Sequence, residues 1–332
     1  MKITFFAVKN WEKLRLKKAL PLHQLLFFKE EASPDNIQKA KDAEIISVFI
    51  YSQVDAAMIA QMPHLKMIAT RSTGFDHIDL KAATKRGIYV CNVPSYGENT
   101  VAEHTFALIL TLSRNIHKSY VRTLRNDFSI EGLIGFDLKN KTIGVVGTGP
   151  IGLHVIKIAK GFGMNVIAFD IQKNEFHAEI LGFRYVSLEE LFKSSDILSL
   201  HVPYNTHTHH LINRDNIHLI KKGALLINTA RGGLIDTVVL LDALESGQFA
   251  GAGLDVLEGE QLIKEEKQLL HNPDQNQNFG QIIRDHVLMS HENVVFTPHI
   301  AFYSQEALQR ILDTTTGNIL GYLDGHPTNL VK

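Results

Sequence analysis

The stretch from Lys141 to Asp170 decides the fold and has the sequence KTIGVVGTGPIGLHVIKIAKGFGMNVIAFD. A short apolar run, residues 142–146, predicts a buried strand, and the six residues after it have the spacing GxGxxG. An apolar helical pattern then leads to a second strand over residues 165–169, which ends on Asp170. Strand, glycine turn, helix, strand and terminal acid in this order are typical of a dinucleotide-binding unit.

Each glycine of the turn has a role in such a unit. Gly147 permits the tight turn, Gly149 lets the backbone approach a pyrophosphate, and Gly152 lets helix and strand pack closely. The helix N-terminus offers N–H groups and partial positive charge to that pyrophosphate. The alternative, a glycine turn that serves packing only, is disfavoured by the correct context on both sides. The residues predicted to bind the cofactor here are Gly147, Thr148, Gly149, Pro150, Ile151, Gly152 and Asp170.

Asp170 also indicates which dinucleotide binds. Its carboxylate would accept hydrogen bonds from the adenosine ribose and would repel a 2′-phosphate. The next residue is Ile171 rather than arginine, although Lys173 lies close by. The sequence therefore favours NAD over NADP as the cofactor.

Composition limits the class of protein. A chain of 332 residues is long for one core, so two domains are expected. The net charge is −1 with no block of one sign, which argues against nucleic acid or a membrane as the main partner. The single cysteine, Cys91, cannot form an internal disulfide. The N-terminus lacks the features of a signal peptide and no apolar run has membrane-spanning length, so a cytoplasmic location is expected.

Short apolar runs alternate with helical patterns, which predicts α/β architecture with mostly parallel sheets. The expected strands are residues 3–8, 25–28, 45–50, 67–70, 88–91, 142–146, 165–169, 196–201, 224–229, 254–257 and 294–296. One long helix is expected over residues 100–117, with Glu103 and His104 as a polar patch at a domain or subunit contact. Residues 119–140 are poorly patterned and suggest an arm that packs on a second subunit. Residues 260–291 form a long polar insertion with some helix.

Residues of distinct chemistry follow the strands of the second half of the chain. Ligands of open α/β sheets bind beyond the carboxyl ends of the strands. Arg231 could bind a substrate carboxylate with its planar guanidinium, and His299 could donate a proton near neutral pH. Glu260 could orient that imidazole. These are the groups that reduction of a 2-keto acid by a nicotinamide cofactor needs; the alternatives are a surface arginine, a satisfied core histidine and a solvated acid.

The chain resembles the D-2-hydroxyacid dehydrogenases over nearly its whole length. The matching segments are RSTGFDHID (71–79), NVPSYGENTVAEHT (92–105), VGTGPIG (146–152), HVPYNTHTHHLIN (201–213), INTARGGLIDT (227–237), GLDVLEGE (253–260) and TPHIAFYS (297–304). The resemblance implies two doubly wound parallel-sheet domains, with a Rossmann NAD-binding domain inserted into a flavodoxin-like substrate domain. The implied boundaries are 1–98 plus 301–332 for the substrate domain and 99–300 for the cofactor domain, with the active site in the cleft and a homodimer as the assembly.

The resemblance also implies roles for particular residues. Arg231, Glu260 and His299 match the catalytic arginine, glutamate and histidine of the family. Asp255 would hold the nicotinamide amide. The backbone of Ser72, Thr73 and Gly74 would bind the substrate carboxylate. The residues expected to line the cofactor cleft are Val202, Pro203, Thr229 and Ala230.

Within this family the chain is most similar to the branch that reduces pyruvate to D-lactate. Tyr51, Tyr96 and Phe302 resemble the aromatic residues of that branch's substrate pocket. The long segment between Glu260 and His299 resembles it as well. The sequence departs from the branch in the polarity of that segment and in the GEN that follows Tyr96, which leaves the exact substrate open.

Three other functions remain as alternatives. The same chemistry could act on glyoxylate, hydroxypyruvate, a bulkier keto acid or a phosphorylated hydroxy acid, although no basic cluster for a phosphate follows Gly74. The NAD fold could instead serve a non-catalytic, redox-sensing protein. A metal site at His207, His209 and His210 is disfavoured, because adjacent histidines are expected to point apart and no acid is paired with them. No metal is predicted.

Overall fold

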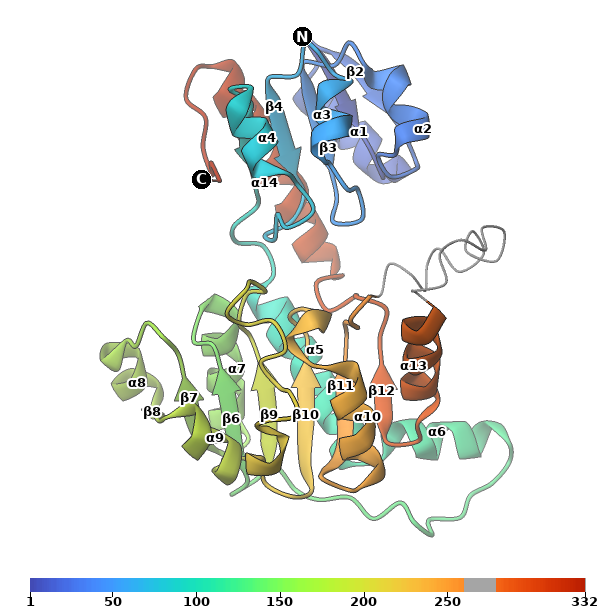
Figure 1. Ribbon diagram of the computed structural model, residues 1–332, viewed down its shortest axis with the longest axis vertical. Coiled ribbons are helices and arrows are strands. Elements are labelled where there is room, and N and C mark those ends of the chain that lie inside the picture. Colours follow the sequence, from blue (N-terminus) through green and yellow to red (C-terminus); the bar gives the residue numbers. More distant parts are fainter. Residues whose placement is uncertain (260–278, 332) are drawn as a thin grey trace. The chain divides into compact units, whose positions relative to one another are not determined.

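The computed structural model describes residues 1–259 and 279–331, and the chain divides into two compact units (Figure 1). Unit 1 is Met1–Tyr96 with Ser304–Lys332, and unit 2 is Gly97–Tyr303. Each unit is built around one parallel sheet with helices on both faces, which confirms the predicted class of two doubly wound domains. Within the described residues, no helix combines the length and apolar character needed to cross a membrane.

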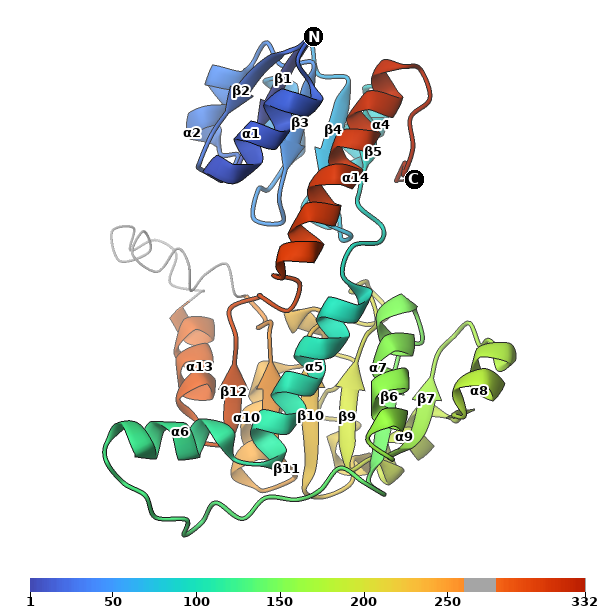
Figure 2. The same cartoon turned by 180° about the vertical axis from the view of Figure 1, so that it is seen from behind.

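The described residues of unit 1 form a five-stranded sheet in the order β2-β1-β3-β4-β5, which is the flavodoxin-like order. Helices α1 and α14 cover one face and helices α2, α3 and α4 the other (Figure 2). The strands are β1 (Lys2–Phe5), β2 (Gln24–Phe27), β3 (Ile45–Val48), β4 (Met67–Thr70) and β5 (Tyr89–Cys91). The helices are α1 (Asn10–Ala19), α2 (Pro34–Ile37), η1 (Gln38–Ala40), α3 (Ala56–Ala60), α4 (Leu80–Lys85) and α14 (Gln305–Leu323).

The described residues of unit 2 form a seven-stranded sheet in the order β12-β11-β10-β9-β6-β7-β8. Counted from β6, this is the Rossmann order 3-2-1-4-5-6 with one further strand at the edge. The strands are β6 (Thr142–Val146), β7 (Asn165–Phe169), β8 (Arg184–Tyr185), β9 (Ile197–Leu200), β10 (Ala224–Asn228), β11 (Phe249–Leu254) and β12 (Val294–Phe296).

Helices α5, α7 and α8 contribute to the core on one face of this sheet, and α9, α10 and α13 to the core on the other. The helices are α5 (Glu98–Ser113), α6 (Ile116–Leu124), α7 (Pro150–Gly161), α8 (Glu175–Leu181), α9 (Leu188–Ser194), η2 (Ile217–Leu219), η3 (Gly232–Leu234), α10 (Thr237–Glu245) and α13 (Phe279–Ser290). Part of the predicted polar insertion, residues 260–278, lies outside the described residues.

Two predicted elements are wrong, each for a physical reason. The strand expected over residues 254–257 is β11, which ends at Leu254 and has the sequence FAGAGL. A Cβ on Gly253 would lie 2.9 Å from the Leu108 Cβ, so the small residues of β11 let α5 pack close to the sheet. For this reason β11 lacks the β-branched residues by which a strand is usually predicted. The single helix expected over residues 100–117 is two helices, because Asn115 adopts a left-handed conformation with φ 50° between α5 and α6.

This close packing predicts opposite effects for two glycine substitutions. Gly253→Ala should lower the free energy of unfolding by about 1–3 kcal/mol, because the new methyl group overpacks against Leu108 and Ile227. Gly317→Ala is the matched control within a helix, where a Cβ meets no described atom within 4 Å, and should raise the free energy of unfolding by about 0.5–1 kcal/mol. Urea unfolding checks both; equal effects of the two substitutions would contradict the packing argument.

Candidate active site

The carboxyl ends of six neighbouring strands in unit 2 meet at one edge of the sheet, and the predicted site residues of this unit follow them. The strands lie in the order β12-β11-β10-β9-β6-β7 and all pair in parallel. The residues that follow them, in the order of the chain, are Gly147, Asp170, His201, Thr229, Asp255 and Thr297. The alternation of the chain therefore collects the cofactor turn, the arginine turn and the histidine loop at this edge, which we call the carboxyl edge of unit 2.

The glycine turn at this edge has the geometry of a pyrophosphate site. Gly147 has φ 98°, and a Cβ there would lie 2.6 Å from the His201 carbonyl oxygen. A Cβ on Gly152 would lie 2.0 Å from the carbonyl oxygen of Gly147, so neither position accepts a side chain. Gly149 is the N-cap of α7, and a Cβ there would meet no described atom within 4 Å. The open space at a helix N-terminus fits the pyrophosphate of a dinucleotide.

Asp170 is held in place beside this turn. One of its carboxylate oxygens accepts hydrogen bonds from the backbone N–H of Thr148 (2.7 Å) and from the Thr148 hydroxyl (3.1 Å). The other accepts from the backbone N–H of Gln172 (2.9 Å). The Tyr185 hydroxyl lies 2.8 Å from the Thr148 hydroxyl, a contact that no sequence pattern indicated. Three hydrogen bonds thus hold the carboxylate in one orientation beside the glycine turn.

The turn that carries Arg231 is fixed by its own backbone contacts. The Asn228 side chain donates to the carbonyl of Arg231 (2.9 Å) and accepts from the N–H of Ala230 (3.0 Å). The Arg231 guanidinium donates to the carbonyl of Ala230 (2.8 Å). A Cβ on Gly232 would lie 2.0 Å from the carbonyl carbon of Leu257, so the turn packs directly against the segment that follows β11. Arg231 therefore has a defined position at the carboxyl edge.

Asp255 organises the loop that carries His299. Its side chain is completely buried, and one oxygen accepts hydrogen bonds from the Thr297 hydroxyl (2.5 Å) and the Ile300 N–H (2.9 Å). The other oxygen accepts from the Ala301 N–H (2.8 Å). The N–H of His299 donates to the Asp255 carbonyl (2.9 Å), and His299 has φ 54°. Besides the contact to nicotinamide that the family resemblance implies, the structure gives Asp255 a role in holding this loop.

His104 belongs to the same network. Its Nε2 lies 2.9 Å from the Thr297 hydroxyl and 3.5 Å from a carboxylate oxygen of Asp255. Burial lowers the pKa of His104, and the Asp255 charge opposes this only in part. The side chain of His104 thus contacts Asp255 and Thr297 within unit 2, and its predicted place at a domain or subunit contact stays a prediction. His104 lies near the start of the apolar pattern over residues 100–117, and nothing in that pattern indicated a contact with Asp255.

A second histidine at the carboxyl edge is neutral. His201 follows β9, and its Nε2 lies 2.8 Å from the Ser199 hydroxyl. Burial lowers the pKa of His201 to about 3. The expected cofactor residues Val202 and Pro203 come directly after it, half-buried and exposed respectively. His201 is therefore an uncharged group at the carboxyl edge near neutral pH.

The predicted substrate loop of unit 1 follows β4. The Ser72 hydroxyl donates to the carbonyl of Gly74 (2.6 Å), and the Thr73 hydroxyl donates to the carbonyl of Val93 (2.8 Å). Arg71 is buried beneath the loop and donates to the carbonyls of Phe6 (2.6 Å) and Ala7 (3.0 Å). Its guanidinium thus supports the sheet.

The predicted pocket aromatics have different positions in the fold. Tyr51 follows β3, next to the substrate loop in the sheet order, and its ring lies edge-on to Phe49 at 6.0 Å. Tyr96 follows β5, and its carbonyl accepts from Arg310 (2.5 Å). Phe302 belongs to unit 2, where its ring lies edge-on to that of His299 at 6.4 Å. The predicted catalytic Glu260 lies outside the described residues.

Comparisons with known proteins show which family this chain is similar to. The model of the family "D-isomer specific 2-hydroxyacid dehydrogenase, NAD binding domain" matches residues 106–301. A crystal structure of D-lactate dehydrogenase from Aquifex aeolicus, complexed with NAD and lactic acid, has a TM-score of 0.89 and 39% identity, covering 98% of this chain and 96% of that one. D-lactate dehydrogenase of Escherichia coli (strain K12) is 36% identical, and the alignment covers 100% of both chains. A glyoxylate reductase of Korarchaeum cryptofilum is 35% identical over 100% of this chain and 96% of its own.

The chain belongs to the D-isomer specific 2-hydroxyacid dehydrogenase family. It is accordingly an NAD-dependent oxidoreductase, and the predictions of the family and of NAD as the cofactor are confirmed.

The hydrogen bonds of Asp255 predict that replacing its carboxylate by an amide lowers turnover. Asp255→Asn places an NH2 group where the carboxylate accepts N–H donors, so the loop from Thr297 to Ala301 should shift. If His299 acts in the reaction, a shift of about 1 Å should lower kcat by up to about 10²-fold. Steady-state rates with NADH and a 2-keto acid measure this. The control is Asp242→Asn, an exposed carboxylate paired with Arg214, which should keep its kcat; an unchanged kcat in Asp255→Asn would contradict the role.

Proposed function

We propose that this protein is a D-lactate dehydrogenase that reduces pyruvate to D-lactate with NADH. The observation that supports it most is the placement of Arg231 and His299 after β10 and β12, on either side of Asp255, at the edge that carries the glycine turn. A cation for a carboxylate and an acid for a carbonyl oxygen are the two groups that a 2-keto acid requires. The D-lactate dehydrogenases of Aquifex aeolicus and Escherichia coli are similar to this chain over 98% and 100% of its length.

Each residue of the proposed site has one task. The bound NADH supplies the hydride. Arg231 binds the substrate carboxylate in a bidentate manner, together with the backbone of the loop from Ser72 to Gly74. His299 donates its proton to the keto oxygen as the carbon accepts the hydride, and Glu260 orients the imidazole and keeps it protonated. In this proposal residues 1–98 with 301–332 form the substrate domain, and residues 99–300 form the cofactor domain.

The cofactor is proposed to bind through the residues predicted to line the carboxyl edge. The turn from Gly147 to Gly152 takes the pyrophosphate, and Asp170 takes the ribose hydroxyls. Val202, Pro203, Thr229 and Ala230 line the space beside the nicotinamide ring, and Asp255 accepts from its amide. These residues follow consecutive strands of one parallel sheet, which supports their common role.

The size of the substrate is proposed from the aromatic residues. Tyr51, Tyr96 and Phe302 would surround the methyl group of pyruvate with apolar surface. The second candidate is glyoxylate, because the reductase from Korarchaeum cryptofilum is about as similar to this chain as the D-lactate dehydrogenase of Escherichia coli. Hydroxypyruvate, a bulkier keto acid and a non-catalytic NAD-sensing role are the remaining candidates.

A panel of keto acids distinguishes these candidates. NADH oxidation is measured with pyruvate, glyoxylate, hydroxypyruvate and 2-ketoisocaproate, with NADPH as the control cofactor and chiral analysis of the product. We expect the highest kcat/KM for pyruvate, D-lactate as the product and a strong preference for NADH. A higher kcat/KM for another acid would overturn the substrate, and no turnover with any acid, although NADH binds, would favour the sensing role.

The proton donor is tested by one substitution. His299→Ala should lower kcat by about 10²- to 10⁴-fold, the usual contribution of a general acid. Thermal stability should change little, because His299 is half-buried on a loop. His218→Ala is the control, since His218 is an exposed histidine of η2. Wild-type turnover of His299→Ala with pyruvate would remove this residue from the mechanism.

We also propose that the protein is a homodimer that associates through α6 and the segment after it. Apolar side chains are exposed there, among them Leu124 (67%), Phe128 (77%) and Ile134 (91%). Large apolar side chains that are exposed along one segment are typical of an interaction surface. Ile134→Asp should shift the mass in sedimentation equilibrium from dimer to monomer, whereas Leu22→Asp, at an equally exposed site of unit 1, should not. A monomeric wild type would overturn the proposal.

A further inference from the structure

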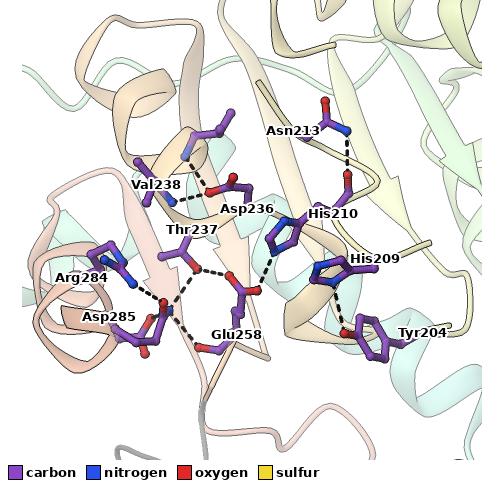
Figure 3. A network of polar contacts seen from close by, with 12 residues as sticks. Tyr204, His209, His210, Asn213, Asp236, Thr237, Val238, Glu258, Arg284 and Asp285 are labelled. Carbon is purple, nitrogen blue, oxygen red and sulfur yellow. Dashed lines mark hydrogen bonds and ion pairs between the residues drawn. The ribbon is translucent and has the colours of Figure 1, made fainter. Parts of the chain in front are cut away.

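Two histidines and a glutamate of unit 2, His209, His210 and Glu258, lie together (Figure 3). One ring nitrogen of His209, one of His210 and one carboxylate oxygen of Glu258 all lie within 4.8 Å of one another. The two imidazole rings are stacked with centroids 3.8 Å apart, and the Nε2 of His210 lies 2.6 Å from an oxygen of Glu258. The sequence disfavoured a metal site here because adjacent histidines were expected to point apart and to have no acid. Both reasons are wrong.

The local backbone explains why the two rings lie side by side. His210 has φ 48°, in the left-handed region, which few residues other than glycine adopt. In an extended chain, successive side chains would point to opposite sides. The acid comes from the segment after β11, 48 positions away in the sequence from His210. A strained conformation that brings two imidazoles to one acid calls for a functional explanation.

Polar groups around the cluster orient the side chains of His209 and Glu258 and hold the backbone of Glu258. The Tyr204 hydroxyl lies 3.1 Å from the Nδ1 of His209 (Figure 3). The Thr237 hydroxyl donates to the second carboxylate oxygen of Glu258 (3.1 Å). Gln281 donates to the carbonyl of Glu258 (3.1 Å). Metal ligands in proteins usually have such partners, which fix the ring orientation and the free oxygen.

We propose that His209, His210 and Glu258 bind one divalent transition-metal ion, and that Zn²⁺ fits best. Two imidazoles and one carboxylate with an open fourth position are a ligand set that zinc accepts. The side chains of His210 and Glu258 are 30% and 26% exposed, so an ion can reach them from solvent. Tetrahedral bonds of about 2.0–2.2 Å place ligand atoms roughly 3.4 Å apart, so His210 and Glu258 must separate by less than about 1 Å. The ion would take the place of the direct contact between these two groups.

A bound ion would link two segments of the carboxyl edge. The N–H of His210 donates to the carbonyl of Gly233 (2.9 Å), in the turn that follows Arg231. The ring of Tyr204 packs on the same glycine, where a Cβ would lie 2.7 Å from the Cε2 of Tyr204. Glu258 belongs to the segment that this turn packs against. An ion held by both segments is therefore expected to raise the thermal midpoint of the protein.

Cobalt serves as the spectroscopic probe for the site. Co²⁺ is titrated into the untagged, full-length protein, and the visible absorption of tetrahedral Co²⁺ is recorded and then displaced with Zn²⁺. We expect one equivalent to bind with this spectrum. His209→Gln and Glu258→Gln should each weaken binding by about 100-fold or more, and Tyr204→Phe by about 10-fold. His207→Gln is the matched control, because His207 is an exposed histidine of the same loop outside the cluster.

The outcomes separate a built site from adventitious surface binding. Loss of binding in His209→Gln and Glu258→Gln, with full binding in His207→Gln, supports the proposal. Absence of one-equivalent binding to the wild type overturns it, and so does equal binding by all variants. His209→Gln leaves the contact between His210 and Glu258 in place, so it tests the site even if Glu258→Gln unfolds. The readout is metal binding, so it does not depend on the substrate of the enzyme.

Discussion

The buried carboxylate of Asp255 is the interaction on which the carboxyl edge of unit 2 depends. A charge with no exposure to solvent is costly unless donors surround it. Here the donors are the hydroxyl of Thr297 and the N–H groups of Ile300 and Ala301, so the charge is satisfied only when the loop has one conformation. His299 lies within that loop and adopts φ 54°. The hydrogen bonds that satisfy the buried carboxylate therefore also fix the position of His299.

Small residues also determine the geometry of the carboxyl edge, because they let helices pack close to the strands that end there. Gly253 of β11 lies against α5, and Gly152 of α7 lies against the glycine turn. A Cβ at Gly253 would lie 2.9 Å from Leu108, and a Cβ at Gly152 would lie 2.0 Å from the carbonyl oxygen of Gly147. A larger side chain at either position would move a helix relative to the strands whose ends carry the site. A change in the packing of the core would therefore also change the positions of the residues at the carboxyl edge.

The sequence predicted those parts of the fold that local chemistry determines. The runs of β-branched and apolar residues in β4, β6, β7 and β12 had the same bounds in the prediction and in the structure. The glycine-rich β11 was misplaced, because its residues were selected by contact with Leu108 and Ile227, which lie far away in the sequence. The break at Asn115 was missed because one left-handed residue leaves the apolar pattern of a helix nearly unchanged. Spacing along the chain holds no information on such contacts.

The candidate site likewise has parts that the sequence predicted and parts that it did not. The glycine turn and Asp170 form a local motif, so they could be recognised from residues close in sequence. The contacts of His104 with Asp255 and of His210 with Glu258 join segments far apart, and no pattern indicated them. The groups proposed for the chemistry common to all 2-keto acids, Arg231 and His299, belong to unit 2, whereas Tyr51 and Tyr96 belong to unit 1. In the proposed mechanism, substitutions in unit 1 can therefore change the accepted side chain while the reaction itself stays the same.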